Sequence, residues 1–110
     1  MNDIEQIEIT LEEARGKVNS MEAVGRLLAN KDFKHVIDNG YFFTEAARLV
    51  MLKADPSMGS PEAQRQVDNQ IMAVGTFRQY LSTIIAMGRT AEMSIAADEE
   101  TREELLAEEL

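Results

Sequence analysis

Residues 60–97 read SPEAQRQVDNQIMAVGTFRQYLSTIIAMGRTAEMSIAA, and this stretch decides the fold. Ser60, Pro61 and Glu62 are residue types preferred at the N-cap, the first position and the first turn of an α-helix. A repeat of alternating four- and three-residue spacings follows, as in helices that pack along one face. Its members are Ala63, Val67, Gln70, Val74, Phe77, Leu81, Ile84, Gly88, Ala91 and Ile95, eight of them apolar. Because no proline interrupts it, the stretch predicts one long C-terminal helix over about 61–97 or beyond.

The middle of this repeat is the predicted helix-packing seam, which consists of Val67, Val74, Phe77, Leu81, Ile84 and Gly88. Phe77 and Leu81 lie where the apolar stripe is broadest, so we expect both to be buried. Gly88 would weaken a helix by about 1 kcal/mol relative to Ala, which predicts a close helix approach or a kink there in preference to a ligand cleft.

The length of the predicted helix sets the architecture. Residues 61–97 would span about 55 Å at ~1.5 Å per residue, whereas a compact chain of this size has a radius of gyration of about 13 Å. The remainder of the chain could not cover such a seam from end to end. We therefore expect a helical hairpin along part of it and a second copy of the chain along the rest.

The N-terminal part supplies the partner helix of that hairpin. Thr10-Leu11-Glu12-Glu13 fits a capping box, and apolar or small residues recur every three or four positions from Leu11 to Leu28. This pattern predicts a helix over about 11–30. Upstream, Ile4 and Ile7 would extend the same stripe, but Ile7, Ile9 and Leu11 also alternate as in a strand, and we expect residues 1–9 to form an extended acidic arm.

The connection between the long helices is predicted to hold two short helices. Phe33, Val36 and Ile37 have helical spacing, and Gly40 is expected to end that helix in the left-handed conformation. Thr44-Glu45 opens a second helix that ends before Asp55-Pro56. The fold class is thus all-α: a single domain over 1–110, built as an elongated helical hairpin or bundle.

Charge is concentrated at the two ends of the chain. The net charge is −9; residues 1–13 hold five acidic residues without Lys or Arg, and residues 98–110 hold seven against Arg102. Direct nucleic-acid binding is disfavoured, because it depends on cationic contacts with phosphates. The acidic ends serve either solubility or docking on a basic partner surface.

The acidic tail over 98–110 is also the candidate partner-binding element. Leu105, Leu106 and Leu110 would form a small apolar edge on a helix, flanked by Glu103 and Glu104. Such an edge suits a groove with a basic rim. The alternative is that the long helix simply continues and these leucines close its hairpin.

Residue types for catalysis and metal binding are scarce. There is no Cys, and His35 is the only histidine, without an HExxH pattern around it. The glycines form no phosphate-binding loop. We predict no catalytic, cofactor-binding or metal-binding residues, hence no enzyme. Apolar runs stay far below the ~18 residues of a membrane span, and the acidic start is unlike a signal peptide.

Several segments resemble a family of small, mostly uncharacterised helical proteins of tailed bacteriophages. They are DFK at 32–34, GYF at 40–42, EAARLV at 45–50, ADP at 54–56 and RQYLSTI at 78–84. The likeness covers about residues 10–105, including the acidic end. It implies a phage origin and a virion-associated or assembly role, in the host cytoplasm during infection and in the virion, and it carries over no active-site residue.

Two functions are compatible with these features. The first is a non-enzymatic phage structural or assembly protein, a helical adaptor that associates with itself and with a phage or host protein, without nucleic acid or membrane. The second is a regulatory binder that inhibits a host or defence protein through its acidic surface. The seven methionines fit either a core or an adaptable partner surface.

Overall fold

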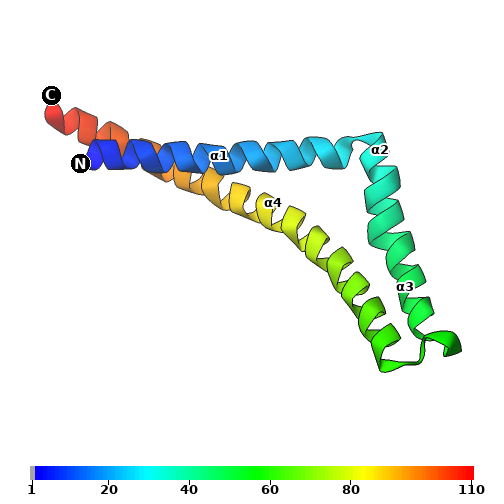
Figure 1. The fold of residues 1–110 in the computed structure, drawn as a ribbon. Coiled ribbons are helices and arrows are strands. Elements are labelled where there is room, and N and C mark those ends of the chain that lie inside the picture. The colour runs from blue at the N-terminus through cyan, green and yellow to red at the C-terminus, as the bar shows by residue number, and fades with distance from the viewer. Residues whose placement is uncertain (1) are drawn as a thin grey trace. The chain divides into compact units, whose positions relative to one another are not determined.

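Every element of the chain is helical in the computed structural model, which describes residues 2–110 (Figure 1). The elements in order are α1 (Asp3–Ala29), α2 (Lys31–Phe33), the π-helix η1 (Lys34–Glu45), α3 (Ala46–Lys53), the 3-10 helix η2 (Pro56–Met58) and α4 (Pro61–Glu109). The prediction of an all-α fold with one long C-terminal helix is confirmed. Helix α4 has 49 residues, so it exceeds the predicted minimum.

The chain divides into two compact units. The terminal unit contains residues 2–25 and 83–110, and the central unit contains residues 26–82. Helices α1 and α4 both run through the boundary.

The terminal unit is an antiparallel pair made by α1 and the C-terminal part of α4. Three contacts fix the register: Ile4 lies in a cleft with Leu105, Arg15 pairs with Glu99 at 3.2 Å, and Met21 lies against Gly88. Figure 1 shows both ends of the chain, blue and red, at the same end of this unit. Its buried apolar residues are Leu11, Ala14, Val24 and Ala91.

The prediction of an extended arm over 1–9 is wrong, because α1 begins at Asp3. The Asn2 side-chain oxygen accepts a hydrogen bond from the Glu5 amide at 2.8 Å, which caps the first turn. Asp3 and Glu5 complement the positive end of the helix dipole. Thr10 lies inside the helix, and its hydroxyl donates to the Gln6 carbonyl. The helical stripe that includes the half-buried Ile4 therefore outweighs the strand-like alternation of Ile7, Ile9 and Leu11.

The central unit is a second antiparallel pair, formed by the segment over 31–53 and the first part of α4. Leu49, Val67 and Val74 form its core. Partly buried side chains pack around them: Tyr41, Phe42, Ala46, Leu52, Met58 and Ile71.

The prediction that Gly40 ends a helix is wrong, because the chain continues through it as η1. Its backbone has no positive φ, and a Cβ at this position would lie 3.1 Å from the His35 carbonyl oxygen. In a π-helix the residue five positions back comes close, and glycine tolerates that approach. The Thr44 hydroxyl makes the same five-residue step when it donates to the Asn39 carbonyl. The two short helices thus form one uninterrupted helical segment with a change of pitch.

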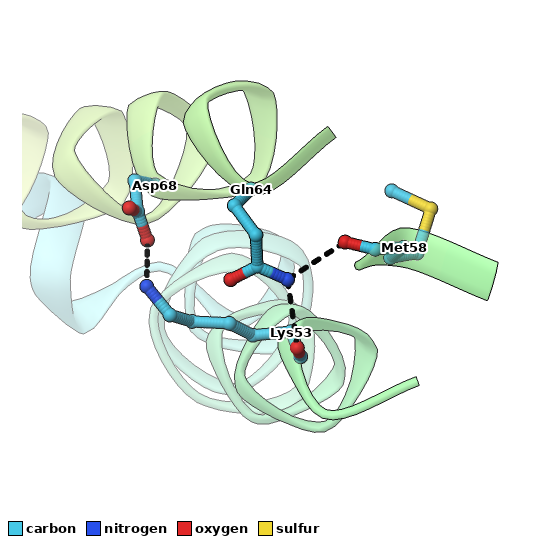
Figure 2. Close-up of polar contacts among 4 residues, drawn as sticks. All are labelled: Lys53, Met58, Gln64 and Asp68. Carbon is cyan, nitrogen blue, oxygen red and sulfur yellow. Dashed lines mark hydrogen bonds and ion pairs between the residues drawn. The ribbon is translucent and has the colours of Figure 1, made fainter. Parts of the chain in front are cut away.

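The tight turn that closes the central unit is held by polar contacts from α4. Figure 2 shows the Gln64 amide donating to the Lys53 carbonyl at 2.9 Å and the Met58 carbonyl at 2.8 Å, beside a Lys53–Asp68 ion pair. The Ser60 hydroxyl oxygen accepts from the Ala63 amide, which confirms the predicted start of the long helix. The Gln64 amide thus satisfies the Lys53 carbonyl, which the end of α3 leaves without a helical partner.

Candidate functional site

Most of the predicted seam is packed inside one unit or the other. Val67, Val74 and Leu81 are buried in the central unit, while Gly88 is buried and Ile84 half-buried in the terminal unit. Each unit thus uses part of the four-and-three repeat of α4 for its own hairpin.

Phe77 departs from the prediction of burial, since 40% of it is exposed. Its ring lies 5.4 Å from that of Phe42 and 6.2 Å edge-on from that of Tyr41. Phe77 therefore packs part of its ring against Tyr41 and Phe42 and keeps the rest in solvent.

Gly88 marks a close helix approach, as its position in the repeat predicted. A Cβ added to Gly88 would overlap the Met21 Cβ and lie 2.7 Å from its sulfur. Met21 occupies the space that a side chain at position 88 would need, which leaves no room there for a ligand.

The candidate partner-binding leucines differ in their exposure. Helix α4 continues to Glu109, so the acidic tail is a continuation of the long helix. Leu105 is half-buried and lines a cleft with Ile4, whereas Leu106 and Leu110 are exposed. Glu103 and Glu104 are also exposed.

Both acidic ends of the chain meet at that cleft, which sequence reasoning did not anticipate. Its lining consists of Asn2, Asp3, Ile4, Leu105, Glu108 and Glu109. Like charges from the start of α1 and the end of α4 are therefore neighbours in the terminal unit. The pairing depends on residues 3–9 being helical, which the local pattern left open.

A shallow groove follows one side of the terminal unit. It consists of two adjoining hollows that share Glu13, Lys17 and Met87. From α1 it is lined by Thr10, Glu13, Ala14, Gly16, Lys17 and Ser20, and from α4 by Ile84, Ala86, Met87, Thr90, Ala91 and Ser94. Small side chains form its floor, and Glu13 and Lys17 are its only charged residues.

The central unit exposes an apolar stripe along its first helical segment. Phe43, Ala47, Val50 and Met51 follow the spacing i, i+4, i+7, i+8, which brings them to one side of a helix. All four are exposed, and Phe43 and Met51 each keep 73% of their surface in solvent. This apolar stripe was not predicted, because sequence spacing cannot say which of two apolar faces the core takes.

A small polar hollow lies beside the stripe. It is lined by Asp38, Asn39, Phe42 and Phe43 from η1 and by Arg78 from α4. Within residues 2–110 the Arg78 guanidinium has no hydrogen-bond or ion-pair partner. The hollow offers charge from Asp38 and Arg78 and aromatic surface from Phe42 and Phe43.

Two carboxylates in the central unit have pKa values below their ordinary range. The Arg48 guanidinium donates to both carboxylate oxygens of Glu45, at 2.9 and 2.5 Å, and this bonding lowers the pKa of Glu45. The pKa of Asp55 is lowered because its carboxylate accepts hydrogen bonds from the Ser57 backbone amide and the Ser57 hydroxyl, both at 2.8 Å. Both arrangements favour the charged form and stabilise helical structure.

Across residues 2–110, no three His, Asp or Glu side chains gather where they could hold a metal ion. None of the helices in that range has the length and apolar content that crossing a membrane requires. Comparison of the chain with protein-family models, curated proteins and solved structures found no match.

Proposed function

We propose that the protein is a non-enzymatic helical adaptor of phage assembly, which associates with itself and binds a second protein. The observation that carries this proposal is the exposed apolar stripe of Phe43, Ala47, Val50 and Met51. Contiguous apolar surface is costly in water and usually marks an interaction site.

The composition of the stripe favours a helical partner. Side chains at i, i+4, i+7 and i+8 suit an amphipathic helix or groove that runs along the segment. Phe43 provides a large anchor, and Met51 can adjust its rotamer to the surface that it meets.

The phage assignment is supported by the sequence resemblance. Two of its segments, GYF at 40–42 and EAARLV at 45–50, coincide with the helical segment that bears the stripe. In this proposal the protein associates with its partners in the host cytoplasm during infection and is then incorporated into the virion.

The test compares two methionines of equal exposure. Met51 lies in the stripe and is 73% exposed, while Met93 lies on the terminal unit and is 76% exposed. Met51→Lys should abolish capture of the partner by the tagged full chain from infected cells, whereas Met93→Lys should leave it intact. Both variants should keep the wild-type circular dichroism.

Mass spectrometry of captured proteins and of purified virions completes the test. A phage structural protein that is captured by wild type, lost with Met51→Lys and found with the chain in virions would support the adaptor. The adaptor proposal would be contradicted if Met51→Lys left partner capture unchanged, or if the wild-type chain captured no partner.

A regulatory binder is the second candidate, and the cleft between the acidic ends favours it. Asp3, Glu108 and Glu109 line one surface of the terminal unit, which could face a basic groove on a host or defence protein. In that case the chain would be absent from virions. Capture would weaken as salt rises and would be lost when Glu108 and Glu109 are changed to Gln.

A further inference from the structure

We infer that two copies of the chain associate through the groove of the terminal unit, about a two-fold axis that lies level with position 15 of α1. This inference rests on the self-association in the proposed function and names the surface that carries it. The groove residues from α1 are Thr10, Glu13, Ala14, Gly16, Lys17 and Ser20.

The spacing of these residues is symmetric about position 15. A two-fold axis there sets residue 15−n of one copy against residue 15+n of the other, as in any isologous contact. Glu13 of one copy then lies level with Lys17 of the other, and Thr10 lies level with Ser20. The exposed Glu13 and Lys17 side chains thus meet opposite charges from the other copy.

The charged residues favour an antiparallel orientation of the two α1 helices. Glu13 and Lys17 are the only charged residues of the groove, and both are exposed. An antiparallel contact between two α1 helices makes two Glu13–Lys17 pairs between copies. A parallel contact in register sets Glu13 against Glu13 and Lys17 against Lys17, which is unfavourable.

The acidic start of α1 also favours the antiparallel orientation of the two helices. Asp3 is twelve residues from position 15, which is about 18 Å along a helix. The two N-terminal ends would therefore lie about 36 Å apart in the antiparallel dimer, several times the Debye length of about 8 Å at physiological ionic strength. In a parallel dimer the acidic ends would be adjacent and would repel each other.

The small core of the terminal unit also suits such a partner. It contains two helices, and its buried apolar residues are Leu11, Ala14, Val24 and Ala91. Helical hairpins of this kind reach a full core in four-helix bundles. The small residues on the groove floor allow a second hairpin to approach closely, and Met87 lies in the groove where it would be covered.

The experiment measures the dimer dissociation constant of the full chain by sedimentation equilibrium. Wild type is compared with Glu13→Lys, Lys17→Glu and the double variant. Each single variant creates two like-charge pairs in the dimer and should weaken it about tenfold, because rim charge pairs are modest individually. Glu12→Lys makes the same charge change as Glu13→Lys, on an exposed residue outside the groove, and should leave the constant unchanged.

The decisive arm is an equimolar mixture of the two single variants. Glu13→Lys presents two lysines and Lys17→Glu presents two glutamates, so the two chains should form a heterodimer about as tight as wild type. Restoration in the double variant alone is ambiguous, because Glu13 and Lys17 also interact within α1 at i, i+4. In the mixture that contact stays broken in both chains, and only pairing between copies can restore association.

Three results would overturn the inference. If the wild-type chain is monomeric, the self-association that the inference assumes does not occur, although partner capture through Met51 could still succeed. A dimer insensitive to both single variants would use another face. A mixture that associates no better than either variant alone would exclude the two-fold pairing of Glu13 with Lys17.

Discussion

Gly88 is a residue at which the two helices of the terminal unit approach closely. The Met21 side chain fills the space above it, and its sulfur would lie 2.7 Å from an added Cβ. A glycine in the middle of a helix is unfavourable on its own, so this position is explained by packing. Gly75, also in α4, has nothing within 4 Å of an added Cβ and therefore provides a matched comparison.

Alanine at these two glycines should have opposite effects on stability. Gly75→Ala should stabilise by about 0.5–1 kcal/mol through helix propensity. Gly88→Ala should destabilise by about 1–2 kcal/mol, because overpacking against Met21 exceeds that gain. Urea unfolding followed by circular dichroism measures both. A stabilising Gly88→Ala would show that the helices are farther apart.

Leu81 and Phe77 differ in burial, and their truncation should differ accordingly. Leu81 is 8% exposed and Phe77 is 40% exposed. Leu81→Ala should cost about 2–4 kcal/mol by leaving a cavity. Phe77→Ala should cost about 1–2 kcal/mol, since the loss is limited to its contacts with the Tyr41 and Phe42 rings. An equal or reversed order in urea unfolding would contradict this packing.

Asp55 makes the stability of the central unit depend on pH in the acid range. Its folded pKa is lowered by the hydrogen bonds from Ser57, below the ordinary value of about 3.9. The folded state then binds fewer protons than the unfolded state, so this stabilisation is complete above about pH 5 and is lost as pH falls through the folded pKa.

The Asp55→Asn variant isolates this contribution. Its side-chain oxygen can still accept from Ser57 but does not titrate. The melting temperature of wild type should fall more steeply between about pH 5 and pH 2 than that of the variant. Parallel curves would mean that the Asp55 contact does not form.

The start of α4 was predictable from sequence, whereas the start of α1 was not. Ser60 and Pro61 form a strong local signal that no nearby residue contradicts. Asn2 and Thr10 are both good caps for α1, and the choice between them depends on Ile4 packing toward the end of α4. That contact joins residues a hundred positions apart, which no local pattern can reveal.

The π-helix η1 and the groove show two further limits of sequence patterns. A π-helical segment of 12 residues is too short to reveal its own periodicity, so Gly40 was interpreted by its usual role at helix ends. The groove depends on how α1 and α4 lie side by side. Once α1 is known to be helical, however, the symmetry of TLEEARGKVNS at 10–20 is visible in the sequence.

Truncation after Ala97 tests whether the end of α4 supports α1. It removes Glu99, which pairs with Arg15, and Leu105, which lies with Ile4. Hydrogen exchange of the amides over residues 5–12 should therefore become faster, because their helix loses its neighbour, while residues 46–53 in the central unit should keep their protection. Unchanged exchange at residues 5–12 would indicate that the acidic tail serves only to dock a partner.

Each unit of the molecule is an antiparallel helix pair with apolar surface left in solvent. The central unit exposes Phe43 and Met51, and the terminal unit exposes Met87 within its groove. The acidic ends are confined to the terminal unit, where they disfavour a parallel contact between copies. These features are consistent with an adaptor that uses the terminal unit for self-association and the apolar stripe of the central unit for a second protein.

The mass of the full chain in solution tests this account most directly. Light scattering after size exclusion, at chain concentrations from below to above micromolar, should give a mass that rises to twice the 12.3 kDa of one chain. The equimolar mixture of Glu13→Lys and Lys17→Glu should give the same doubled mass under conditions where each variant alone is monomeric. A wild-type mass of 12.3 kDa throughout, or a mixture that stays monomeric, would contradict it.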